Sequence, residues 1–168
     1  MGSDELTLRP LGAADLPELR RIRATPEVVR WWGPLSDDLT DVDSDTSLLT
    51  IEIGGAVAGL VQIFEEPDPQ YRHASIDLFL DPALHGRGFG TEAVNRAVRH
   101  VVDERGHHRV TIDPAAANTV AIRTYEKVGF KPVGVMRSYE RDADGHGWHD
   151  GLLMELVAGE EWPSAAGE

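Results

Sequence analysis

The stretch ASIDLFLDPALHGRGFG, residues 74–90, sets out a strand, a turn and a glycine-rich loop ahead of an amphipathic segment that continues to Arg105. Residues 74–80 are short and mostly apolar, and Asp81-Pro82 stops them as a turn stops a strand. Beyond the turn, apolar residues recur with the spacing of one buried helical stripe, at positions 89, 93, 94, 97, 98, 101 and 102. The pattern predicts a strand that leads into a helix through the loop 85–90.

The loop HGRGFG, residues 85–90, has the composition of an anion site at a helix N-terminus. Glycines let the main chain approach a ligand, the free N–H groups of a first helical turn favour an anion, and Arg87 adds a positive charge. These features favour a phosphate or pyrophosphate, although a turn that only packs the helix on the strand has the same composition. No Gly-Lys-Ser/Thr follows, so the loop is not a P-loop, and its Gly-x-Gly-x-Gly spacing is not the dinucleotide fingerprint.

The segment resembles motif A of the GCN5-related N-acetyltransferases (GNAT), Gln/Arg-x-x-Gly-x-Gly/Ala after a strand. In that family the loop amides hold the pyrophosphate of acetyl-coenzyme A. Gly88 and Gly90 match the motif, whereas His85 stands where the family has Gln or Arg. The resemblance implies acetyl-CoA as co-substrate, bound by Leu78, Leu80, His85, Gly86, Arg87, Gly88, Phe89, Gly90, Thr91, Asn118, Ala121 and Tyr125.

The length and composition of the chain restrict its class. Its 168 residues suit a single domain, with flexible ends expected at 1–4 and 159–168. A net charge of −13 disfavours nucleic acid and anionic membranes as partners and favours a cationic ligand, although many soluble proteins are simply acidic. Without cysteine there is no disulfide, thiolate metal site or cysteine acyl-enzyme. We expect a cytoplasmic protein that uses no metal, with its seven histidines on the surface.

The remaining patterns predict a mixed α/β (α+β) arrangement, the order of a single-domain GNAT fold, with about seven strands and about four helices. Gly54-Gly55 joins two strands as a tight hairpin, while Thr25 and Asn118 occupy helix-capping positions. Further strands are expected at 6–9, 48–53, 56–64, 109–112, 131–141 and 148–157. Further helices are expected at 15–23, from residue 26 to 32, and after residue 118.

A second segment narrows the resemblance. TIDPAAANTVAIRTYEKVGF, residues 111–130, resembles the Asp-Pro-x-x-x-Asn-x-x-Ala-Ile-Arg-x-Tyr-Glu-Lys-x-Gly-Phe segment of aminoglycoside 6′-N-acetyltransferases. Trp31-Trp32-Gly33, Ile76-Asp77 and the ending at 150–155 are also similar to members of that group. The resemblance implies acetyl transfer to a primary amine of a polycationic amino sugar in a ternary complex. Acyltransferases of lysine-type siderophore precursors share the Asp-Pro…Asn segment, and an inactive coenzyme-binding sensor is a third alternative.

Two aspartates are candidates for the proton chemistry of amine acylation, because an amine attacks only after it loses its proton. Asp77 matches the active-site aspartate of the family and lies in an apolar strand, where an inward carboxylate is costly to bury without a partner or function. An outward position at an edge is its alternative. Asp113 follows a strand at the sheet end where α/β proteins bind ligands, and capping of the next turn is its alternative.

Tyr125 matches the family's tyrosine near the coenzyme sulfur. A phenol with a pKa of about 10 stays protonated at neutral pH and donates to a thiolate whose conjugate acid has a pKa of about 8.5. A tyrosine on an amphipathic helix is otherwise an ordinary core residue. Asn118 serves the pantetheine arm, the helix cap, or both.

The expected acceptor is a small cationic amine, bound by Trp31, Trp32, Asp77, Asp113 and Asp150. Neighbouring tryptophans on one helix point about 100° apart, so one of them should line a surface or cleft. The alternative is one tryptophan in the core and one partly covered, without contact to a ligand. The loop 36–47, with aspartates at 37, 38, 41, 43 and 45, is either a solvated linker or an acidic rim that attracts the acceptor. It lacks the glycine and final glutamate of a calcium loop. A monomer or a homodimer is compatible with the sequence.

Overall fold

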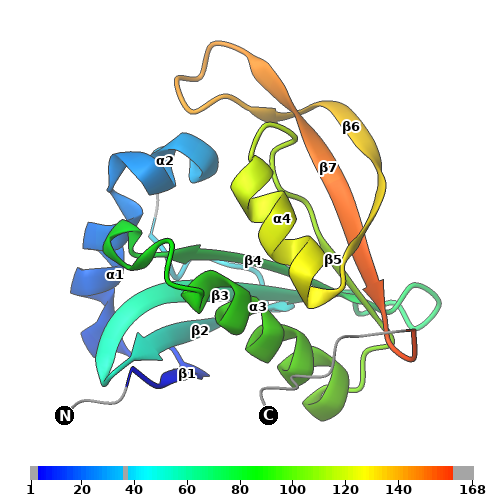
Figure 1. Ribbon diagram of the computed structural model, residues 1–168, viewed down its shortest axis with the longest axis horizontal. Coiled ribbons are helices and arrows are strands. Elements are labelled where there is room, and N and C mark those ends of the chain that lie inside the picture. Colours follow the sequence, from blue (N-terminus) through cyan, green and yellow to red (C-terminus); the bar gives the residue numbers. More distant parts are fainter. Residues whose placement is uncertain (1–3, 36–37, 161–168) are drawn as a thin grey trace.

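The computed structural model describes residues 4–35 and 38–160. The described residues form seven strands and four α-helices, in the order expected for the GNAT fold. Figure 1 shows how these elements are arranged. The strands are β1 Leu6–Pro10, β2 Thr46–Ile53, β3 Ala56–Glu65, β4 Ala74–Leu80, β5 Arg109–Ile112, β6 Lys131–Arg141 and β7 Trp148–Val157. The helices are α1 Leu16–Arg23, α2 Pro26–Trp32, α3 Phe89–Arg99 and α4 Thr119–Val128, and a π-helical turn, His100–Glu104, extends α3.

All strands belong to one mixed sheet with the order β1-β2-β3-β4-β5-β7-β6. Neighbouring strands run antiparallel except β4 and β5, which are parallel. The β2–β3 hairpin turns at Gly54 and Gly55, whose positive φ angles of 58° and 82° are those of the tight turn predicted from the sequence. The fold class and the seven-stranded sheet with four helices are therefore confirmed.

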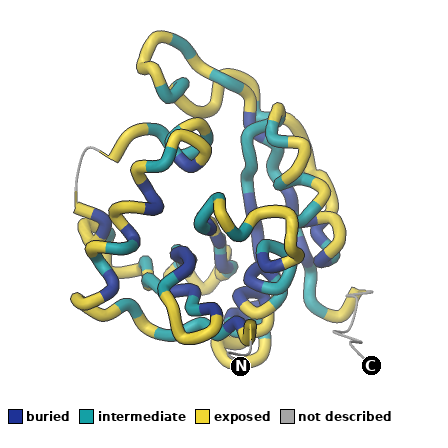
Figure 2. The backbone as a smooth tube through the Cα atoms, turned by 60° about the vertical axis from the view of Figure 1, so that its left-hand side comes forward, coloured by how far each residue is buried: buried dark blue, intermediate teal, exposed yellow. Residues whose placement is uncertain are grey.

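Helices cover both faces of the sheet and create two apolar clusters. The larger cluster joins α3 and α4 to one face through residues such as Ala93, Val98 and Tyr125. The smaller one joins α1 and α2 to the other face, where Leu19 and Val28 pack near Phe79. In Figure 2 the buried residues lie where helices meet the sheet, and the tip of the β6–β7 hairpin is largely exposed.

The central strands β4 and β5 separate soon after they meet. Their pairing is confined to Ala74 with Val110 and Ser75 with Thr111, although β4 continues to Leu80. The rest of β4 has a partner only on its β3 side. The sheet therefore opens toward the carboxyl ends of β4 and β5, where Asp77 and Asp113 lie.

One of the two helix-capping predictions needs correction, and the predicted flexible ends fall mainly outside the described residues. Thr25 occupies the position before α2, but its hydroxyl donates to the Ile22 carbonyl at 2.7 Å and does not cap the helix amides. Asn118 does cap α4, since its Oδ1 accepts from the Ala121 amide at 3.2 Å. None of the described helices is long and apolar enough to cross a membrane.

Candidate active site

The predicted coenzyme loop ends β4 and opens α3 in the conformation that an anion site requires. Gly86 and Gly88 have φ angles of 76° and 82°, which L side chains rarely adopt. A Cβ atom built on either glycine would meet no protein atom within 4 Å among the described residues, so both glycines face open space. The first-turn amides of α3 have no partner within the helix and are available to a ligand. The main chain of this loop therefore fits a pyrophosphate.

The side chains of the loop are partly engaged. Arg87 lies over the Phe89 ring at 5.0 Å and contacts the Asp4 carboxylate at 3.3 Å, with half of its side chain exposed. An exposed ion pair of this kind is weak, so the guanidinium is free to exchange Asp4 for a phosphate. The His85 ring instead hydrogen-bonds the Leu80 carbonyl at 3.0 Å. His85 thus ties the loop to the end of β4, a role that the sequence did not predict.

Helix α4 lies beside α3 and carries the remaining predicted coenzyme residues. A Cβ atom at Gly90 would lie 4.0 Å from the Thr124 side chain, which shows how closely the two helices approach. Ala121 is partly buried against the main cluster, and Tyr125 is buried with its ring edge-on to Phe130. Leu78 and Leu80 from β4 pack in the same cluster, and Thr91 lies in the first turn of α3.

Asp77 lies on the face of β4 that is turned toward α1 and α2, next to Phe79 of the smaller cluster. The sequence predicted a costly buried carboxylate, but the Asp77 side chain is exposed. The short pairing of β4 with β5 explains the difference, because it leaves this part of the strand uncovered on one side. Asp77 Oδ1 accepts from the Leu78 amide at 2.9 Å.

The surroundings of Asp77 raise the pKa of its carboxyl group to about 7. Partial loss of hydration among the protein atoms around it is the first cause, and the negative charge of Asp113 is the second. Solvent still reaches the side chain and moderates both effects. Asp77 is accordingly a group that changes its protonation near neutral pH.

Asp113 directly follows β5, at the end of the strand where the sequence placed it. Main-chain hydrogen bonds fix its loop on β7: Ala116 N donates to the Asp150 carbonyl and Leu152 N to the Pro114 carbonyl, both at 2.8 Å. Asp113 Oδ2 accepts a 2.7 Å hydrogen bond from the Tyr139 hydroxyl of β6. Sequence reasoning missed Tyr139, because its position depends on an irregularity in β6 that no local pattern signals.

Tyr125 completes the group of titratable residues. Burial raises the pKa of its phenol well above the usual value, and the charges of Asp77 and Asp113 act in the same direction. Such an effect requires the three groups to share one region of the molecule, since charges separated by much more than 10 Å are screened. The fold therefore brings Asp77, Asp113 and Tyr125 together, and the phenol is a protonated donor at neutral pH.

The two tryptophans divide as the helical geometry predicts. Trp32 packs edge-on against Phe79 at 5.2 Å and belongs to the core beside β4. The buried Arg23 guanidinium lies 5.4 Å from the Trp32 ring, and its charge acts on Asp77. Trp31 points elsewhere, has the Arg30 guanidinium over its ring at 4.6 Å, and lines a pocket.

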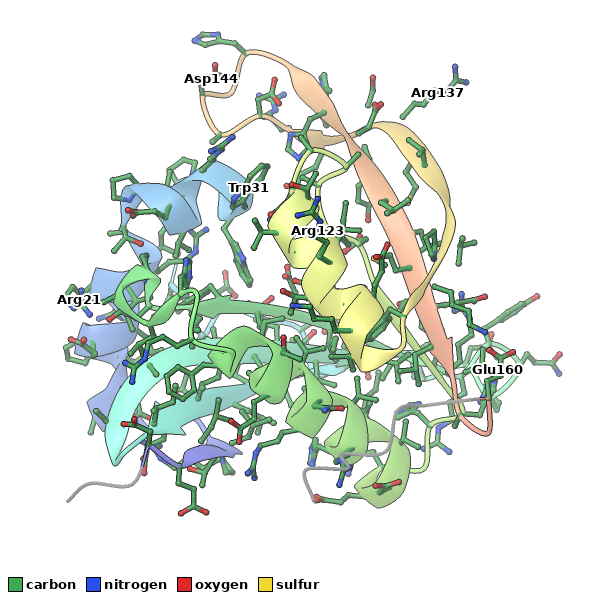
Figure 3. All side chains as sticks on the ribbon, in the orientation of Figure 1. Arg21, Trp31, Arg123, Arg137, Asp144 and Glu160 are labelled. Carbon is green, nitrogen blue, oxygen red and sulfur yellow. The ribbon has the colours of Figure 1, made fainter. Side chains whose placement is uncertain are left out.

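That pocket, of about 400 Å³, lies between α2, the loop before α4 and the β6–β7 hairpin. Its wall includes Arg30, Trp31, Ala115–Ala117, Asp142, Ala143, His149 and Asp150. Figure 3 shows Trp31 at the end of α2 that faces α4, with Asp144 in the hairpin beyond it and Arg137 pointing away. Asp150 therefore lies in the same pocket wall as Trp31, and its Oδ1 also accepts from the Ser138 amide at 2.8 Å.

The acidic loop after α2 is not part of that wall. Asp38 accepts from Thr40, and Asp43 from Thr46 and the Asp45 amide, so these carboxylates stabilise local turns. Asp45 lines a separate pocket of about 470 Å³ with Glu65, Arg105 and other residues. Asp37 lies outside the described residues. These contacts support a solvated linker at this loop better than an acidic rim that attracts the acceptor.

Two of the seven histidines differ from the surface positions expected of them. His107 is buried, and its Nε2 lies 2.8 Å from Glu65 Oε1, which also binds Arg105. His149 is partly buried, with Nδ1 2.9 Å from Asp142 Oδ1. The sequence alone did not indicate that His107 contacts Glu65 or that His149 contacts Asp142. Among the described residues, no group of three or more His, Asp or Glu side chains is arranged to hold a metal ion.

Residues 5–131 match the family described as "Acetyltransferase (GNAT) domain", so the chain belongs to the GNAT acetyltransferase family. It is similar to the aminoglycoside N(6')-acetyltransferase type 1 of Klebsiella pneumoniae, with 30% identity over 158 residues that cover 80% of this chain and 78% of the relative. The resemblance inferred from the motifs is thereby confirmed.

Two solved structures illustrate the likeness. The aminoglycoside acetyltransferase AAC(6')-Ib in complex with paromomycin and acetyl-CoA is 25% identical, with a TM-score of 0.74 over 92% of this chain and 94% of that one. Spermidine N-acetyltransferase from Vibrio cholerae, in complex with CoA and spermine, is 21% identical with a TM-score of 0.78 over 90% and 95%. At that identity the second comparison shows the fold alone.

Proposed function

We propose that this GNAT acetyltransferase transfers the acetyl group of acetyl-CoA to a primary amine of an aminoglycoside-type polycationic amino sugar, by direct attack in a ternary complex. The observation that carries the proposal is the convergence of two carboxylates, Asp77 and Asp113, on the region of Tyr125 at the open end of the sheet. The similarity to aminoglycoside 6′-N-acetyltransferases supports the choice of acceptor.

Acetyl-CoA supplies the activated acyl group and the thiol leaving group. Its pyrophosphate suits the amides of the loop 86–90, and Arg87 adds a charge-assisted contact. Asn118 keeps its amide NH₂ available to the pantetheine arm while its Oδ1 caps α4. These assignments need only donors that the loop and α4 already present.

Asp77 and Asp113 bind the acceptor's ammonium group, and Asp77 takes a proton from it. A base that titrates near pH 7 is suited to this step, because an ionised carboxylate and a removable proton then coexist near neutral pH. Tyr125, held protonated by its raised pKa, donates to the departing sulfur. Trp31 and Asp150 contact the rest of the sugar in the adjoining pocket.

Acylation of a siderophore-precursor amine and coenzyme sensing without turnover remain the competing functions. A thiol-release assay with acetyl-CoA and a panel of aminoglycosides, polyamines, hydroxylysine and peptide amines separates them. We expect turnover to be greatest with an aminoglycoside. Preference for hydroxylysine would favour the siderophore function, and tight coenzyme binding without thiol release would favour a sensor.

A further inference from the structure

Strand β6 carries a local irregularity opposite the candidate catalytic aspartates. Its pairing with β7 shifts register between Met136 and Glu140. Within this interval Ser138 has a φ angle of 50°, the single positive φ among the described residues other than glycine. Such a backbone is costly and persists only where its surroundings enforce it. Asp150 provides the restraint, because its Oδ1 accepts from the Ser138 amide at 2.8 Å.

The irregularity places the Tyr139 ring on the backbone of β7. A Cβ atom at Gly151 would lie 2.9 Å from Tyr139 Cδ1, so the ring occupies the space that any larger residue at this position would fill. From there the hydroxyl reaches Asp113 Oδ2 at 2.7 Å, across 26 positions in the sequence. The Tyr139 phenol therefore reaches the Asp113 carboxylate through three features: the strained backbone of Ser138, the restraint from Asp150 and the small Gly151.

In the Tyr139–Asp113 hydrogen bond, the phenol is the donor and the carboxylate is the acceptor. Donation to Asp113 is the first cause that raises the pKa of Tyr139, to about 12, so the phenol remains a donor throughout the neutral range. Hydrogen bonds donated to a carboxylate favour its charged form. The other groups acting on Tyr139 are the anions Asp77 and Glu140, and neither accepts its proton in the structure.

We propose that Tyr139 is a positioning residue for acetyl transfer: its hydroxyl holds Asp113 as the fixed counter-charge of the acceptor's ammonium group, which leaves Asp77 as the carboxylate that accepts the proton. This inference rests on the proposed function, since it needs an amine at Asp113. It assigns different roles to two carboxylates, since the charge of Asp113 acts on Asp77.

The test is a double-mutant cycle in steady-state kinetics. Tyr139→Phe keeps the ring and its packing on Gly151 but removes the donor, so kcat/KM for an aminoglycoside should fall about 10-fold, mainly through KM, with KM for acetyl-CoA unchanged. In the Asp113→Asn background the same change should have an effect below about 2-fold. Tyr71→Phe, at an exposed tyrosine, is the matched control. Equal losses in both backgrounds, or no loss in either, would overturn the inference.

A readout in the free protein separates this inference from the proposed function. The pH titration of the Asp77 carboxyl carbon, followed by NMR, should move to higher pH in Tyr139→Phe, because the negative charge of Asp113 then acts on Asp77 without the hydrogen bond that balances part of it. An unchanged titration midpoint in the folded variant would contradict the positioning role. If the midpoint moves but no amine is acetylated by the wild type, the arrangement of the carboxylates stands and the proposed function fails.

Discussion

At the scale of single residues, the raised pKa of Asp77 makes activity depend on pH. A carboxyl with a pKa near 7 is protonated in acid and cannot accept a proton from the amine. We expect kcat/KM for the acceptor to rise with pH through about 7, and this acidic limb should disappear in Asp77→Asn together with most of the activity. A wild-type profile that is flat from pH 5 to pH 8 would rule out Asp77 as the titrating base.

The same pKa predicts the sign of a stability change. Between the ordinary carboxyl pKa of 3.8 and about 7, folded Asp77 keeps a proton that the unfolded chain releases, so stability falls as the pH rises through this window. Asp77→Asn removes this pH-dependent loss of stability, because the asparagine side chain does not ionise. Thermal unfolding should show a larger gain in Tm for this variant at pH 8 than at pH 4, and an equal gain at both would count against the shift.

Tyr125 is predicted to act as the general acid. Tyr125→Phe retains the buried ring beside Phe130 and deletes only the proton donor. Turnover should fall roughly 10- to 1,000-fold with little change in coenzyme affinity. Pre-steady-state kinetics would check whether chemistry or product release limits turnover, and wild-type rates of the chemical step in the variant would refute the acid role.

At the scale of elements, the loop between β4 and α3 should control coenzyme binding. Gly88→Asp puts a side chain and a negative charge at a left-handed position beside the first-turn amides, so acetyl-CoA binding should be lost in calorimetry. Arg87→Ala serves as the milder comparison, with a cost of roughly 1.5–3 kcal/mol because the amides remain. Unchanged affinity in folded Gly88→Asp would disprove the loop assignment.

The buried carboxylate of Asp15 connects β1, β2 and the turn before α1. Asp15 binds the Arg9 guanidinium at 2.7 and 2.8 Å and also accepts from Thr50 and the Gly12 amide. Hydrogen bonds from Arg9, which have the largest effect, and from Gly12 and Thr50 hold the pKa of Asp15 well below its usual range. The stability that these bonds give the folded protein is therefore present at neutral pH and lost in acid. Asp15→Ala should lower the free energy of unfolding by about 3–5 kcal/mol in urea denaturation, and a change below 1 kcal/mol would contradict the assigned role.

Elements with local signals were predictable, and contacts between distant segments were not. Gly54-Gly55, Asn118 and the stripe from Phe89 each carry a short-range signature, and the structure follows them. The exposure of Asp77 depends on how soon β5 leaves β4, which residues 74–80 do not encode. The partners of His107 and Tyr139 are set by tertiary packing, so their roles became visible only in the fold.

At the scale of the whole molecule, the charge of −13 should act mainly on encounter with the substrate. The described aspartates of the acidic loop engage in local turns or line a different pocket, and surface charges are screened beyond about 8–10 Å at physiological salt. Replacing Asp41 and Asp45 by Asn should therefore reduce the association rate and its salt dependence only through the loss of net charge, with little change in kcat. Asp103→Asn with Glu126→Gln, both exposed and elsewhere, is the control for net charge. A larger effect of the loop pair than of this control would show that the loop acts as an acidic rim.

We propose that Asp77 and Asp113 hold the amine that receives the acetyl group. The most direct measurement is kcat/KM for an aminoglycoside in the wild type, Asp77→Asn and Asp113→Asn, with acetyl-CoA affinity as the check on folding. Each substitution should cost on the order of 2–4 kcal/mol in kcat/KM, because a partly desolvated ammonium loses its charged partner. Wild-type kinetics in both variants would show that neither carboxylate holds the amine, and would favour a different acceptor.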